Sequence, residues 1–139
     1  MEYKTVWLLG GRIIFNKLHD GVEPQHIHEV VTKNVRMMDT ESQSDLIHII
    51  YDMQDTNLSG DVVSFQKASR PMFTHISMGW LIVINNQENR VVNMMASMVS
   101  KIFSAQFRQF NSLEEGLKFL QTMDSSLPDL SKLEAPNGD

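Results

Sequence analysis

The feature that most constrains the fold is a nearly unbroken apolar run at residues 46–51, Leu-Ile-His-Ile-Ile-Tyr, rich in β-branched side chains. Such a run is typical of a strand buried on both faces of a parallel sheet. A second strand of this kind is expected at residues 80–84, Trp-Leu-Ile-Val-Ile. Two buried strands separated by polar and helical segments predict an α/β domain.

Turn and helix signals surround the first of these strands. Residues 5–9 and 12–18 flank a Gly-Gly dipeptide and predict a β-hairpin, since glycine adopts positive φ without steric cost. Residues 23–39 predict a helix that begins at a Glu-Pro pair, because proline suits the first helical position. A shorter helix is expected over residues 62–70, and it should stop before Pro71 because proline disfavours helical backbone in the preceding residue.

The second half of the chain continues the alternation. Residues 91–103 predict a longer helix, and residues 106–110 predict a short strand at the edge of the sheet. Ser112 and Glu115 have the spacing of a capping box and mark the start of a last helix. Residues 126–139 contain few apolar side chains and are expected to form a flexible C-terminal tail.

The predicted order of elements is therefore β, β, α, β, α, β, α, β, α, in a single domain spanning residues 1–125. Strands that alternate with helices imply parallel pairing and right-handed crossovers. The expected architecture is a mostly parallel sheet of about four or five strands with an antiparallel N-terminal strand and about four helices.

Composition excludes several classes of partner and site. The net charge of -5 is spread along the chain without a run of lysine or arginine, so no nucleic-acid partner is expected. The absence of cysteine excludes disulfides and thiolate metal sites. No cationic leader precedes an apolar stretch and no apolar run is long enough for a bilayer, so we expect a cytoplasmic protein without stable membrane insertion.

Motifs for catalysis and cofactor binding are absent from the sequence. Neither GxGxxG, GxxxxGK[ST] nor GxSxG occurs, so no enzyme, no cofactor and no catalytic residue is predicted. His19, His26 and His28 lie close enough in sequence to suggest zinc ligands, but residues 26 and 28 point to opposite sides of a helix, so no metal is predicted. His48 is expected to be a hydrogen-bonded core histidine in preference to a catalytic base.

The polar stretch at residues 52–60 is the predicted binding surface, because ligands of α/β proteins gather at the carboxyl ends of parallel strands. The simpler interpretation, which is favoured, is that Asp55, Asn57 or Ser59 caps the helix that follows. The candidate binding residues are Asp52, Asp55, Thr56, Asn57, Ser59 and Gly60.

Methionines broaden the apolar face of the helix predicted at residues 91–103. Met94, Met95 and Met98 either line a site for a small apolar ligand, because methionine adapts to irregular shapes, or pack in the core or in a homodimer interface. The packing interpretation is the simpler of the two.

Several segments together resemble the SpoIIAA-like family of the STAS superfamily, which includes the sporulation anti-sigma-factor antagonists. They are residues 12–18 leading through Asp20-Gly21-Val22-Glu23-Pro24 into a helix, the strand at 45–52 with its polar exit, the strand at 79–85, and the closing residues 110–117. The resemblance covers residues 3–123. It implies a domain that acts through protein contacts or small, lipid-like ligands and has no enzymatic activity.

The antagonists of this family carry an Asp-Ser-Ser-Gly motif whose first serine is phosphorylated. Aligning its Ser-Gly on Ser59-Gly60 places Leu58 at the phosphorylated position and Asn57 at the aspartate, so the same switch is not expected here. Ser59 and Thr56 are alternative positions for a phosphoryl group near a helix N-terminus. The expected function is a regulatory protein-protein interaction module with a protein partner; the alternative is a binder of a small apolar or lipid-like ligand.

Overall fold

The computed structural model describes residues 3–41, 46–54, 56–85 and 106–136. Its elements, in chain order, are β1 Tyr3–Leu9, β2 Ile13–Leu18, β3 Asp20–Val22, α1 Pro24–Glu41, β4 Ile47–Asp52, β5 Thr56–Leu58, α2 Val62–Phe73, β6 Met78–Ile84, β7 Phe107–Phe110 and α4 Leu113–Met123. The helix predicted at residues 91–103, with Met94, Met95 and Met98, lies outside the described residues.

Five strands form the main sheet in the order β1-β2-β4-β6-β7. β1 pairs antiparallel with β2, and the pairs β2–β4, β4–β6 and β6–β7 are parallel. Gly11, with φ of 73°, lies in the turn that joins β1 to β2, where a left-handed backbone suits glycine. The α/β class, the mostly parallel sheet, the antiparallel first strand and the edge position of β7 are confirmed.

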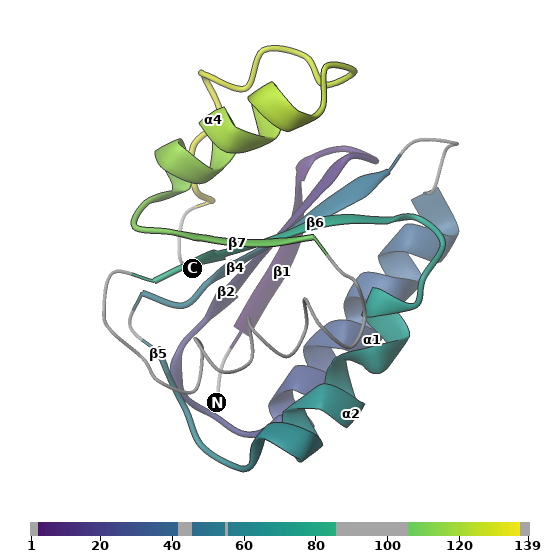
Figure 1. Ribbon diagram of the computed structural model, residues 1–139, viewed down its shortest axis with the longest axis vertical. Helices are drawn as coiled ribbons and strands as arrows, with labels where there is room; N and C mark the ends of the chain where they lie inside the picture. The colour runs from purple at the N-terminus through teal and green to yellow at the C-terminus, as the bar shows by residue number, and fades with distance from the viewer. Residues whose placement is uncertain (1–2, 42–45, 55, 86–105, 137–139) are drawn as a thin grey trace.

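Helices cover both faces of this sheet (Figure 1). α1 and α2 lie on one face and α4 lies on the other. Strands that follow one another across the sheet through right-handed crossovers place their helices on the same side, which explains the position of α1 and α2. Within β4, Ile49 and Tyr51 point toward α1 and α2, whereas Ile50 points toward α4.

A second, two-stranded sheet, which the sequence did not predict, is formed by the segments that follow the carboxyl ends of β2 and β4. β3 pairs in parallel with β5, with Asp20 opposite Thr56 and Val22 opposite Leu58. The polar stretch at residues 52–60 is therefore partly a strand, β5.

The prediction that α2 stops before Pro71 is wrong. The helix continues to Phe73 and closes where the Thr74 N–H donates to the Arg70 carbonyl at 3.0 Å. Pro71 lies in the last turn, so its missing N–H removes one helical bond only. Met72 is fully buried, and this burial offsets the lost bond.

The prediction of a flexible tail from residue 126 is wrong for the segment up to Leu133. Leu127 and Leu130 are 5% and 1% exposed and pack with α4 against the sheet. The Gln121 side chain accepts from the Leu130 N–H at 2.7 Å and donates to the Leu127 carbonyl at 3.3 Å. A few leucines are enough to hold this segment on the domain, because they cover the part of the sheet face beside α4. The structure also places residues 126–133 within the domain predicted to end at residue 125.

Two buried asparagines connect the sheet to α1. Asn16 and Asn34 are fully buried and exchange amide hydrogen bonds of 3.0 and 2.9 Å. Asn34 also donates to the Val30 carbonyl, and Asn16 accepts from the Thr5 hydroxyl. Because a buried amide without partners is unfavourable, this pairing fixes the position of α1 on β2.

No helix among the described residues has both the length and the apolar character that crossing a membrane requires.

Candidate functional site

The predicted binding residue Asp52 turns inward at the carboxyl end of β4. The residue is 6% exposed, and its Oδ1 lies 3.3 Å from the Nζ of Lys17. The same oxygen accepts from the Gln54 N–H at 3.2 Å. Asp52 therefore holds the end of the strand together and offers little surface to a partner.

Thr56 is also engaged within the fold. It is 3% exposed, and its hydroxyl donates to the Leu18 carbonyl at 2.6 Å, across the junction between β2 and β5. Asn57 belongs to strand β5, and Asp55 lies outside the described residues. The inner half of the predicted binding stretch thus has a structural role where it is described.

Ser59 and Gly60, in contrast, are exposed. The Ser59 N–H donates to the Val22 carbonyl at 2.8 Å. Gly60 has φ of 132°, and a Cβ built there would lie 2.8 Å from the Cδ of Pro24, so any side chain would be strained and would crowd the start of α1. These restraints hold an exposed loop in one shape.

Asp61 caps α2, so the prediction that Asp55, Asn57 or Ser59 provides the cap is wrong. Its Oδ1 accepts from the Ser64 N–H at 2.9 Å, and this hydrogen bond holds the pKa of the Asp61 carboxyl below its usual range. The cap must be the residue directly before the first helical position, and α2 begins at Val62. The sequence left this start uncertain because no proline or capping box marks it.

An apolar side chain stands beside this cap. Val63 is 56% exposed in the first turn of α2, next to Asp61 and the exposed Ser59-Gly60 loop. We call Ser59, Gly60, Asp61 and Val63 the α2 N-terminal surface. It combines hydrogen-bonding groups, one carboxylate and one exposed aliphatic side chain on a fixed backbone.

His48 lies near the opposite, amino-terminal end of the parallel strands. It is 1% exposed, its Nδ1 accepts from the Trp80 N–H at 3.0 Å, and its Nε2 lies 2.8 Å from Oδ2 of Asp124. Because Nδ1 is an acceptor, the proton of the neutral ring is on Nε2. Burial lowers the pKa of His48 despite the nearby carboxylate. The prediction of a hydrogen-bonded core histidine is confirmed.

Asp124 joins His48 to the C-terminal segment and to Arg12. Its Oδ2 lies 3.1 Å from Nη2 of Arg12, and its Oδ1 accepts from the Ser126 N–H at 3.0 Å. Burial raises the pKa of Asp124, but hydrogen bonds from Ser126 and His48 more than offset this effect and lower the pKa to about 2. The cluster fastens the end of α4 to the sheet, and sequence spacing offers no signal for it.

The three N-terminal histidines do not converge. His26 accepts a hydrogen bond through Nδ1 from the Glu23 N–H at 2.9 Å and so satisfies a donor at the start of α1. His28 is exposed further along the same helix. In the part of the chain that the structure describes, no three side chains of the metal-binding types come together.

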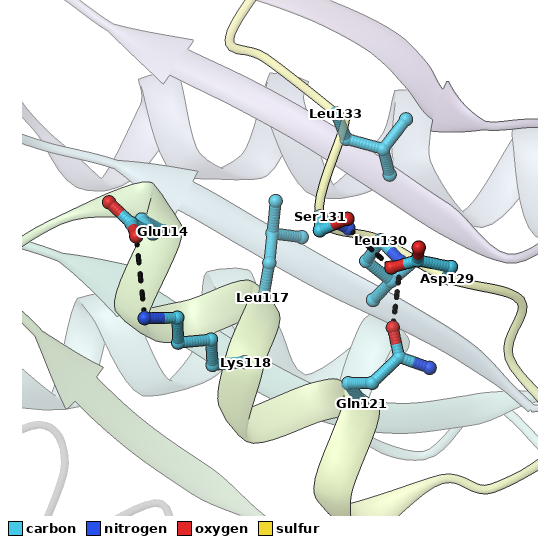
Figure 2. Close-up of a pocket in the computed structure, with 8 residues that line it drawn as sticks. All are labelled: Glu114, Leu117, Lys118, Gln121, Asp129, Leu130, Ser131 and Leu133. Carbon is cyan, nitrogen blue, oxygen red and sulfur yellow. Dashed lines mark hydrogen bonds and ion pairs between the residues drawn. The ribbon is translucent and has the colours of Figure 1, made fainter.

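An apolar groove of about 300 Å³ lies between α4 and residues 129–133. Figure 2 shows Leu117 rising from α4 toward the segment that carries Leu130 and Leu133. The Glu114–Lys118 ion pair, 3.3 Å long, stands on the exposed side of the helix. This groove can accept a small apolar group and was not predicted, because it depends on how the C-terminal segment packs.

A second hollow, of about 480 Å³, lies between β1 and α1. Its lining comes from Tyr3 and from one side of α1 between His28 and Met37.

No protein-family model, curated protein sequence or solved structure matches this chain. The SpoIIAA-like resemblance therefore remains a prediction from the sequence.

Proposed function

We propose that this domain is a regulatory protein-protein interaction module of the SpoIIAA-like type, which binds its partner through the α2 N-terminal surface and catalyses no reaction. The observation that carries the proposal is the exposed Val63 beside Asp61 on a backbone that is fixed in advance. Binding to a rigid surface avoids the entropy cost of ordering a loop, so such a surface suits specific recognition.

The hydrogen bonding of the interior supports a role without chemistry. Both ring nitrogens of His48 are engaged, so this ring has no free atom to accept a proton from a substrate. Among the described residues, every buried side-chain nitrogen or oxygen has a hydrogen-bond partner. These polar groups stabilise the fold. Their burial is therefore explained by a structural role and does not require a catalytic one.

Quantitative affinity capture from the source cells tests the proposal. The wild-type protein should retain a specific partner, and Val63→Asp should lose it. Ile76→Asp is the matched control, because Ile76 is an equally aliphatic side chain, 93% exposed, in the turn between α2 and β6. Loss of the partner from both variants, or from neither, would contradict the assignment of the surface.

The groove beside α4 favours a second candidate function, binding of a small apolar or lipid-like ligand. Its leucines, Leu117, Leu130 and Leu133, form a concave apolar surface of the kind that takes an acyl chain. Native mass spectrometry of the purified protein should then detect a copurified mass. That mass should disappear in Leu133→Glu, which changes the half-buried rim of the groove, and persist in Val63→Asp.

A further inference from the structure

The edge of the main sheet formed by β1 is suited to pairing with another chain. Among the described strands β1 ends the sheet, and its residues Tyr3–Leu9 include no proline and only one charge, Lys4. Edge strands expose backbone N–H and C=O groups, and proteins usually protect them with charges, prolines or bulges. β1 has one bulge, between Trp7 and Leu9, which leaves its first five residues regular.

The hollow of about 480 Å³ reaches this edge at Tyr3, the first residue of β1. Tyr3 and Met37 provide its apolar part, and both side chains also pack on the core. Lys33 and Arg36 provide two cations, against a single carboxylate, Glu29. We call this combination of strand edge and helix wall the β1–α1 groove.

The cations of the groove are directed to solvent. Lys33 and Arg36 are exposed, and neither forms an ion pair with an acidic side chain among the residues described. A positive groove on a chain with a net charge of -5 is a local reversal of sign. Such a reversal favours an acidic partner and discriminates against a basic one.

We propose that the β1–α1 groove binds an extended acidic segment of another protein, which pairs with β1 as an additional strand. Alternate side chains of such a segment point to opposite faces of the sheet, so carboxylates on the α1 side can approach Lys33 and Arg36 while apolar residues on the other side lie beside Val6 and Leu8 of β1. A second copy of this chain is a poorer occupant, because its own β1 carries only Lys4 and brings no carboxylate to the two cations. The groove is separate from the α2 N-terminal surface and gives the domain a second binding site.

A short labelled peptide of alternating glutamate and valine is a direct probe, with fluorescence polarisation as the measurement. It should bind the full chain, and its affinity should fall as salt screens the carboxylates. A lysine–valine peptide carries positive charges in place of the carboxylates, and a glutamate–proline peptide cannot donate the strand hydrogen bonds at its prolines. Each should bind at least about tenfold more weakly.

Hydrogen–deuterium exchange locates the peptide. Bound peptide should slow exchange in residues 3–9, because their outward amides become hydrogen-bonded. The double variant Lys33→Glu, Arg36→Glu should weaken binding by about tenfold or more. Lys67→Glu with Lys132→Glu makes the same change in net charge at exposed positions on α2 and in the C-terminal segment, and it should retain binding.

Four results would overturn the proposal. They are no binding of the glutamate–valine peptide, equal binding by the charge-reversed protein, protection of a segment other than β1, and a dimer of the free protein in which exchange of residues 3–9 is already slow. The last result would assign the edge to a second copy of the chain. Because Val63→Asp leaves the groove intact, failure of this proposal is distinguishable from failure of the proposed function.

Discussion

His48 occupies the space that a side chain at position 79 would need. A Cβ built on Gly79 lies 2.5 Å from Nδ1 of His48, closer than such atoms approach in proteins. The ring cannot move away easily, because its two nitrogens are hydrogen-bonded to the Trp80 N–H and the Asp124 carboxylate. Glycine at this position is therefore a condition for burying the histidine.

Gly79→Ala should destabilise the fold by roughly 1–3 kcal/mol, because the added methyl group overpacks a site that has no slack. Chemical denaturation measures the free energy of unfolding. Gly10→Ala is the control, since nothing lies within 4 Å of a Cβ built at that glycine. Equal stability of the two variants would contradict the close approach.

Asp124 should make the free energy of unfolding depend on pH in the acidic range. Its pKa falls from 3.8 to about 2 on folding, so the unfolded chain binds the proton more readily. The resulting stabilisation, up to about 2 kcal/mol, is present above pH 4 and is lost as the pH falls toward 2. Asp124→Asn should be less stable at neutral pH and should show a flatter pH profile over this interval, measured by denaturant titration at each pH.

The buried asparagine pair should show energetic coupling. Asn34→Leu removes the two hydrogen bonds that the Asn16 amide exchanges with Asn34 and should cost about 1–3 kcal/mol, because buried polar atoms lose a partner. Asn16→Leu should cost a similar amount. The double variant should lose less than the sum of the two, and strict additivity in this double-mutant cycle would show that the amides do not act as a unit.

Asp61→Ala should destabilise the protein by about 1 kcal/mol, because the Ser64 N–H at the start of α2 loses its acceptor. Asp61→Asn keeps an acceptor oxygen and should retain most of the stability. Ser59→Ala is a further control and should have little effect on the thermal midpoint, which would be different if Ser59 were the cap.

Removal of residues 126–139 should destabilise the domain, whereas a flexible tail would be dispensable. Leu130→Ala isolates the contribution of the segment and should cost about 2–4 kcal/mol, since this side chain is 1% exposed in the core on the α4 face. Pro136→Ala, close to the C-terminal end, is the matched substitution that should leave the free energy of unfolding unchanged.

Local sequence signals predicted the elements that depend on neighbouring residues. Ser112 and Glu115 marked the start of α4, and the Glu115 N–H indeed donates to the Ser112 hydroxyl at 3.2 Å. The two apolar runs became the central strands β4 and β6, and Pro24 opens α1. Capping, β-branching and proline geometry act over a few residues, so they can be read along the chain.

Only tertiary structure decided the sites. Arg12 and Asp124 are 112 positions apart and meet because α4 returns across the sheet, and no local rule links them. The same holds for Tyr3 and Arg36, which line one hollow between β1 and α1. Asp52 appeared on sequence grounds to be a binding residue, but the pairing of β2 with β4 sets it against Lys17. The sequence by itself thus determined an α/β chain with its order of strands and helices, because those preferences are local. Packing decided which polar groups stabilise the interior and which stay exposed, because burial and distance depend on the whole fold.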